Sequence, residues 1–346
     1  MTTPAPRPPS WPRLLLAAAL ACAAMAPAAA ATTNAESGYA ARQGFAFALL
    51  GGVPAHDGDE AAVAQMLAQF GTETDLAIHT GNIKGRDERC DDKTYARRHA
   101  LLNGSPVPLV LAPGENDWAE CDRLAAGQFG PVERLNRLRE LFFDPDDSLG
   151  MLKLDLQRQS ETARFRGYPE NARWEYGDVL FVTLNVPGNQ NNYRTGAGRN
   201  GEYEERVQAD ASWLRQAFAA ATRLKARGLV LAFSADPHFE GRHTVAGGVD
   251  PYAALKTDLA RLAAKYAGQV LVVHGGGPSP ERGRSRHALA DHPLKFNGKT
   301  LQNVARVAMP AAPEPAHWIK VNVEPGNRDV FRLEGINTVL RPPQPR

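Results

Sequence analysis

The chain has 346 residues, of which 43% are hydrophobic and 23% are charged, and its formal net charge is +2. These are the values of an ordinary globular protein that can form a real hydrophobic core in one large or two modest domains. Because acidic and basic residues nearly balance, the composition gives no sign of binding to nucleic acid or to an anionic membrane surface.

The first 31 residues differ from the rest of the chain. Arg7 and Arg13 precede an apolar run over 14–26, and the alanines at 28–31 offer small-residue cleavage positions. This pattern is typical of a secretory signal peptide, so we expect 1–31 to be removed on export to the periplasm or the extracellular space. The apolar run is shorter than the ~20 residues that cross a bilayer, so we expect no stable membrane span.

The three cysteines bear on the same question. Cys22 follows Leu20-Ala21 in a sequence that resembles a lipid-attachment site, which makes a lipoprotein the alternative. Cleavage of a signal peptide leaves Cys90 and Cys121, and two cysteines in an exported chain favour one disulfide. Its loop of about 30 residues would stabilise the fold by roughly 3 kcal/mol. Two buried thiols are the alternative, and metal ligation is less favoured because neither cysteine has a second one at zinc-site spacing.

After a polar segment at 32–43, apolar runs alternate with amphipathic segments. In chain order, the pattern predicts strands at 45–50, 75–78, 107–111, 179–184, 229–233 and 269–273, and helices at 61–70, 95–102, 135–142, 204–227 and 252–266. Strands alternating with helices imply a largely parallel sheet. The stretch 144–173 is polar and irregular, and 318–333 predicts an antiparallel pair. No linker divides the chain, so we expect a single domain over 44–340.

Six of these runs end in short polar or glycine turns. In an open α/β sheet such turns gather beyond the carboxyl ends of the strands, where ligands bind. The turns are Gly51-Gly52-Val53-Pro54, His79-Thr80-Gly81-Asn82, Gly114-Glu115-Asn116-Asp117, Asn185 with Pro187, Ser234-Ala235-Asp236-Pro237-His238, and His274-Gly275-Gly276-Gly277-Pro278. Anionic oxygens and neutral imidazoles in such turns can hold two divalent metals that hydrolyse a phosphate ester.

The order of these motifs resembles that of the calcineurin-like metallophosphoesterases, a group that includes the purple acid phosphatases. The resemblance runs from about Phe45 to Leu333. It implies an α/β fold of four layers, α/β/β/α, with mainly parallel central sheets. It also implies phosphoric-ester hydrolysis with two divalent metal ions as cofactors, and a phosphorylated small molecule or another anionic ligand as partner.

Several metal-ligand positions of that family are replaced in this chain. The family's first motif, Asp-x-His, falls on Gly52 and Pro54, and the aspartate of its second motif falls on Asn82. Its final Gly-His-x-His places Gly276 and Pro278 at the histidines. Glycine and proline side chains donate nothing to a metal, and an amide in place of a bridging carboxylate removes charge compensation from a low-dielectric cleft. The sequence therefore predicts weak or lost two-metal catalysis.

The remaining candidates support one weakly bound cation at most. The residual metal-ligand candidates are Asn82, Asn116, His238 and His274, the catalytic candidates are Asn116, His238 and His274, and the accessory residues are Glu115, Asp117, Asp236 and His79. Each has a structural alternative, since His79 and His274 end apolar strands where histidines are often hydrogen-bonded core residues. Asp117 can cap a helix, and Asp236 can form a turn with Pro237. Two main interpretations remain: a metal-dependent phosphoesterase, and a non-catalytic relative whose crevice binds a ligand or partner. A third is an adhesive or structural exported protein with no small ligand.

Overall fold

The computed structural model describes residues 44–144, 146–196, 198, 200–241, 244–277, 289–310 and 317–334. All of them belong to one compact unit that runs from Ala41 to Arg346. The expected signal peptide at 1–31, the polar segment 32–43, Cys22 and Pro278 lie outside the described residues. In the part of the chain that is described, no helix has the length and apolar character needed to cross a membrane.

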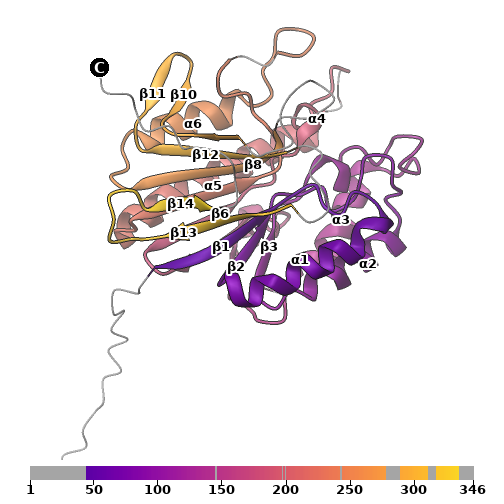
Figure 1. Cartoon of the computed structure of the whole chain (residues 1–346). Helices are drawn as coiled ribbons and strands as arrows, with labels where there is room; N and C mark the ends of the chain where they lie inside the picture. The colour runs from indigo at the N-terminus through magenta and orange to yellow at the C-terminus, as the bar shows by residue number, and fades with distance from the viewer. Residues whose placement is uncertain are drawn as a thin grey trace, which may run out of the picture. The chain divides into compact units, whose positions relative to one another are not determined.

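The first sheet has five strands in the order β14-β13-β1-β2-β3 (Figure 1). Their bounds are Phe45–Leu50 for β1, Leu76–His79 for β2, Leu109–Leu111 for β3, Ile319–Val323 for β13 and Phe331–Glu334 for β14. Strands β1, β2 and β3 pair in parallel, whereas β13 pairs antiparallel with β1, and β14 pairs antiparallel with β13. The antiparallel pair predicted at the end of the chain is therefore confirmed.

The second sheet has seven strands in the order β4-β5-β6-β7-β8-β12-β9. Their bounds are Gln157–Arg158 for β4, Ala172–Tyr176 for β5, Val179–Thr183 for β6, Gly228–Phe233 for β7, Gln269–Gly277 for β8, Leu289–Asp291 for β9 and Val304–Pro310 for β12. The four strands β6, β7, β8 and β12 are parallel, and the outer pairs are antiparallel.

The structure has strands where the sequence pattern predicts none. Four of them, β4, β5, β9 and β12, are in the second sheet, and β10 (Leu294–Phe296) and β11 (Lys299–Leu301) form a separate antiparallel pair. The reason is composition, because β5 alternates apolar and polar side chains and β12 is interrupted by Arg306. Neither gives the continuous apolar run that marks a buried parallel strand.

Helices cover the outer face of each sheet. On the first sheet these are α1 (Glu60–Glu73), α2 (Asp92–Asn103) and α3 (Pro131–Phe142), and on the second they are α5 (Gly201–Leu224) and α6 (Ala253–Ala263) (Figure 1). In α1 the buried residues Val63, Met66, Leu67 and Phe70 recur at helical spacing and form the apolar stripe that faces the sheet. A third apolar cluster joins the inner faces of the two sheets. The expected four-layer α/β/β/α architecture is confirmed.

Strand register brings the turns of each sheet together. Leu50 at the end of β1 pairs with His79, which pairs in turn with Leu111 at the end of β3. In the second sheet Phe233 at the end of β7 pairs with His274. The turns that follow these strands therefore lie at one edge of each sheet, as expected for parallel strands.

Candidate functional site

A buried carboxylate joins the turns after β2 and β3. Asp117 is fully buried, and it accepts backbone N–H groups from Asn82, Ile83 and Gly114 at 2.8 Å each. Burial raises the pKa of Asp117 to about 7, although the hydrogen bonds from Gly114 and Asn82 and the charge of Lys84 act to lower it. Both carboxylate oxygens are used by the protein's own backbone, so Asp117 maintains the shape of these turns.

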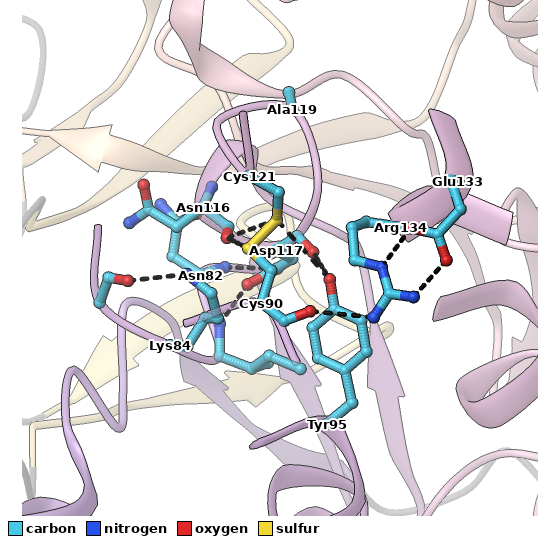
Figure 2. Close-up of a disulfide and its surroundings, with 12 residues drawn as sticks. Asn82, Lys84, Cys90, Tyr95, Asn116, Asp117, Ala119, Cys121, Glu133 and Arg134 are labelled. Atoms are coloured by element: carbon cyan, nitrogen blue, oxygen red, sulfur yellow. Dashed lines mark hydrogen bonds and ion pairs between the residues drawn. A yellow bond between two sulfur atoms is a disulfide. The ribbon is translucent and has the colours of Figure 1, made fainter. Parts of the chain in front are cut away.

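A disulfide lies beside this carboxylate (Figure 2). Cys90 and Cys121 are bonded, with their Cα atoms 5.8 Å apart, and they are 31 positions apart in the chain, which confirms the predicted pairing. The Tyr95 hydroxyl donates a hydrogen bond of 2.5 Å to the backbone carbonyl of Asp117. The disulfide thus connects the segment before α2 to the turn after β3, next to the residues that sequence analysis placed in the site.

Asn82, the expected replacement for a bridging carboxylate, uses both ends of its amide within the protein. Its nitrogen donates to Glu115 Oε1 at 2.9 Å, and its oxygen accepts the backbone N–H of Asn116 at 2.9 Å. Its backbone is left-handed, with φ at 58°, a conformation that asparagine adopts more readily than most residues. The structure therefore brings Asn82 and Asn116 together, but the contact is made by the backbone N–H of Asn116 and not by its side chain.

Glu115 connects turns from the two sheets. Besides Asn82, its carboxylate accepts the backbone N–H of Gly188 at 3.0 Å and the Ser234 hydroxyl at 3.4 Å. Gly188 follows β6 and Ser234 follows β7. A Cβ atom at Gly188 would lie 2.6 Å from the Glu115 carboxyl group, so only glycine permits this approach. The sequence indicates Glu115 as an accessory residue, but no local signal predicts these two partners.

The turn after β1 contributes backbone rather than ligand side chains. Gly52 has a left-handed φ of 70° and donates its N–H to the Gly81 carbonyl at 2.9 Å. Pro54, in the same turn, is buried. At the neighbouring Gly51 a Cβ would lie 2.0 Å from Thr80 Oγ1, so this turn packs tightly against the next one.

His79 is a fully hydrogen-bonded core residue. Its Nδ1 accepts the Gly81 N–H at 3.0 Å, so the ring proton is on Nε2, which donates to the Val53 carbonyl at 2.7 Å. Burial lowers the pKa of His79 to about 4. The neutral ring has no lone pair left for a metal ion.

His274 differs from His79 because one ring nitrogen is unused. Nδ1 donates to the Gly275 carbonyl at 2.6 Å, which leaves a lone pair on Nε2, and Nε2 has no hydrogen-bond partner among the described residues. The ring is fully buried and stacks on Phe233 at 5.9 Å between centroids. Burial lowers its pKa, against the raising effect of Asp236. A histidine that donates Nδ1–H to a carbonyl is oriented as metal-binding histidines are.

Asp236 and His238 lie near His274. Asp236 Oδ1 accepts the backbone N–H of His238 at 2.9 Å, and its Oδ2 is 3.9 Å from His238 Nδ1. Burial acts to raise the pKa of Asp236, but His274 and the His238 N–H outweigh it, so the pKa lies below its ordinary value. Gly276 has a left-handed φ of 65°, and a Cβ there would lie 3.2 Å from the Asp236 nitrogen.

The turn after β6 has an unusual backbone. Residues Asn189 to Asn192 are all left-handed, although none is glycine; asparagine adopts this conformation more readily than most residues, so the largest cost falls on Gln190. Arg206 offsets part of this cost by donating to the Asn191 side chain at 2.6 Å and to its carbonyl at 2.8 Å. Asn189 and Gln190 remain exposed beside Gly188. Strained segments of this kind are concentrated at functional sites.

The donor groups at this edge do not fit a two-metal site. Asn82, Glu115 and His79 use their polar atoms in hydrogen bonds within the protein, and Gly52 and Gly276 have no side chain to offer. Within the described ranges, no group of three or more His, Cys, Asp or Glu residues could hold a metal ion.

Comparisons with known proteins give similarity at the level of structure only. No protein-family model matches the chain, and no curated protein matches its sequence. A solved structure described as GAP50, the anchor in the inner membrane complex of Plasmodium, is 11% identical with a TM-score of 0.44, covering 86% of this chain and 89% of that one. The crystal structure of TT1561 of Thermus thermophilus is 10% identical with a TM-score of 0.40, covering 84% of this chain and 98% of that one. At these values neither similarity establishes the family of this chain.

Proposed function

We propose that this chain is an exported, phosphoesterase-like protein whose strand-end crevice binds a ligand without hydrolysing phosphate esters through two metals. The observation that supports this most directly is the bonding of Glu115. Its carboxylate, the best remaining anionic ligand of the first three turns, is engaged by Asn82, Gly188 and Ser234. Two adjacent dications need several anionic oxygens to offset their repulsion, and the other carboxylate of these turns, Asp117, is also engaged, by three backbone N–H groups.

Export is part of the proposal. It is supported by the signal-like composition of 1–31 and by the Cys90–Cys121 disulfide, because disulfides persist mainly in oxidising compartments. A phosphorylated small molecule is the first ligand class to test, since the motif order implies it. The exposed amides of Asn189 and Gln190 can donate hydrogen bonds to such a ligand.

Metal content and hydrolysis test the proposal together. The mature protein, purified with its disulfide intact, is expected to retain less than one equivalent of divalent metal after dialysis. We expect its turnover of an aryl phosphate with added Mn²⁺ or Zn²⁺ to lie far below the roughly 1–10³ s⁻¹ of ordinary enzymes. Two bound equivalents with ordinary turnover would overturn the proposal.

A second experiment restores the metal-binding side chains that the family has at the replaced positions. The variant carries Gly52→Asp, Asn82→Asp, Gly276→His and Pro278→His. Gly52 and Gly276 are left-handed, so the new side chains also strain the backbone, and Asn82→Asp alone is the control without that strain. Metal uptake and hydrolysis gained only by restored variants would support the binding interpretation.

A ligand screen by thermal melting tests the binding interpretation directly. A rise in melting temperature of the parent chain with one member of a panel of phosphates, nucleotides and sugars would identify its ligand.

One observation favours the alternative of a single weakly bound cation. His274 Nε2 carries a lone pair without a partner among the described residues, and Asp236 lies near it. Titration of the parent and of His274→Phe with Zn²⁺, followed by calorimetry, separates the two interpretations. Binding to the parent that His274→Phe abolishes would support the cation site, and heats that are equally small in both would exclude it.

A further inference from the structure

A cavity of about 550 Å³ lies away from the strand-end turns of the candidate site. It is lined by the first residues of β8 and β12 in the second sheet and by β14 in the first sheet, all of which are labelled in Figure 1. The candidate site described above lies beyond the carboxyl ends of the strands, whereas this cavity is at the amino-terminal ends of β8 and β12. Its volume is in the range of roughly 300–1,000 Å³ found for small-molecule sites.

The floor of the cavity belongs to the core between the two sheets. Leu271 and Val307 contribute from the second sheet and Phe331 from the first, and all three are members of the inter-sheet cluster. Ala305 and Leu333 pack against the same cluster but are only partly buried. Leu271 and Val307 are fully buried behind the cavity, so the apolar surface that a ligand meets there is that of Ala305, Leu333 and a small part of Phe331, and the small side chain of Ala305 leaves room.

The rim of the cavity carries charged side chains on the turn before β14 and on β14 itself. Arg328 and Arg332 are exposed there, with Asp329 between them. Arg332 Nη1 is 3.5 Å from Glu324, and its side chain stays 62% exposed, so this pair is weak. The Gln269 side chain fixes the turn by donating to the Arg328 carbonyl at 2.7 Å and accepting the Val330 N–H at 2.7 Å.

A third arginine on the lining does not add to the charge of the rim. Arg306 is nearly fully buried and makes ion pairs with Asp291 and Glu240, so its charge is compensated within the protein. The cationic groups that face the cavity mouth are thus Arg328 and Arg332, opposed by Asp329.

We propose that this cavity binds a small amphipathic anion, with an apolar chain on the inter-sheet floor and a carboxylate at the arginine rim. A medium-chain fatty acid has this chemistry. Burial of the chain supplies most of the affinity, and the arginines, whose planar donor groups match a carboxylate, fix the orientation of the ligand. The proposal does not depend on the function proposed for the strand-end crevice.

Isothermal titration of the mature protein with sodium decanoate, below its micelle concentration, tests the proposal. Ala305→Phe fills the floor and is expected to weaken binding by at least about tenfold. Arg328→Ala with Arg332→Ala is expected to weaken it about fivefold, and Asp329→Asn to strengthen it about twofold. Arg166→Ala, an exposed arginine outside the cavity lining, is the matched control and is expected to change nothing.

Decanol separates the contribution of the head group from that of the chain. It is expected to bind more weakly than decanoate to the parent and to be insensitive to the arginine substitutions, yet to be blocked by Ala305→Phe. Circular dichroism melting checks that each variant is folded. If Ala305→Phe is not folded, the binding measured for the arginine and Asp329 variants tests the proposal instead. Failure of the parent to bind decanoate, or equal binding by the arginine double variant, would overturn the proposal.

Discussion

The residues that sequence analysis placed at the strand ends of the two sheets differ in how completely their polar atoms are used. In the first sheet, both nitrogens of His79 at the end of β2 and both oxygens of Asp117 after β3 have hydrogen-bond partners. In the second sheet, Asn185 Oδ1 after β6 and His274 Nε2 within β8 are buried with no partner among the described residues. Buried polar groups are normally satisfied, and those that are not call for an explanation. The indole N–H of Trp118, directly after Asp117, also has no partner among the described residues, so the difference holds for His79 and Asp117 and not for every polar group near these turns. It indicates that His79 and Asp117 are structural, and that His274 is the better candidate for any remaining chemistry.

The strongest way to break this comparison is to remove Asp117. Asp117→Ala leaves the buried backbone N–H groups of Asn82, Ile83 and Gly114 without their acceptor, and should lower the free energy of unfolding by about 4 kcal/mol. Urea denaturation followed by fluorescence measures it. Asp122→Ala, whose side chain is 46% exposed, is the control and should cost less than about 1 kcal/mol. Equal costs would contradict the structural role.

Removing the disulfide should have the next largest effect. Cys90→Ala with Cys121→Ala opens a loop of 31 positions, which predicts a loss of about 3 kcal/mol in the free energy of unfolding. The parent measured with a reducing agent is the control, and should lose a similar amount. A double variant as stable as the oxidised parent would show that the bond does not constrain this part of the fold.

Acid should weaken the first sheet's turns through His79. Its pKa in the fold is lowered from 6.5 to about 4, so as the pH falls below 6.5 the unfolded chain binds a proton that the folded chain does not. The free energy of unfolding therefore decreases as the pH is lowered. His79 alone accounts for a decrease of about 2.5 kcal/mol between pH 8 and about pH 4.5. Asp117, with its raised pKa, acts in the opposite direction over the same range.

The difference between the parent and His79→Gln isolates the histidine. Asp117 and the other groups are common to both chains, so their contributions cancel to first order. The difference in unfolding free energy should be largest at pH 8 and shrink as the pH falls. A difference that stays constant from pH 8 to about pH 4.5 would mean that His79 is not buried in its neutral form.

The smallest expected effect on stability is that of replacing His274, which can be compared directly with replacing His79. His274→Phe removes an unpaired buried nitrogen together with one hydrogen bond, to the Gly275 carbonyl, and keeps a ring against Phe233, so it should change the free energy of unfolding by no more than about 1 kcal/mol. His79→Phe, the matched change, should cost about 2 kcal/mol because Val53 and Gly81 lose their partner. Thermal and urea denaturation at pH 8 measure both. A larger loss at His274 would assign it a structural role as well.

The sequence predicted the parts of the fold that depend on local pattern. Runs such as Phe45–Leu50 are continuous and apolar, so strands buried on both faces could be recognised, and their order implied the layers. Strand β5 was not predictable in this way, because its Arg173 and Glu175 interrupt the apolar pattern. The disulfide followed from the number of cysteines and the expected compartment.

The candidate site could be placed from the sequence but not described in detail. Motif order indicated which turns meet, since parallel strands bring their carboxyl ends together. The partners of Glu115 are 73 and 119 positions away in the chain, at Gly188 and Ser234, and no local signal specifies contacts over such separations. The unused nitrogen of His274 likewise depends on packing that only the fold determines.

The hydrogen bonds of Glu115 have a consequence for any molecule that binds at these strand-end turns. The Gly188 N–H, the Ser234 hydroxyl and the Asn82 amide converge on one carboxylate supplied by the protein itself. An incoming phosphate or carboxylate that uses these donors must displace that side chain, so Glu115 acts as a tethered competitor with a high local concentration. Affinity for such a ligand is then set by the exchange of one anion for another, and shortening Glu115 would raise it.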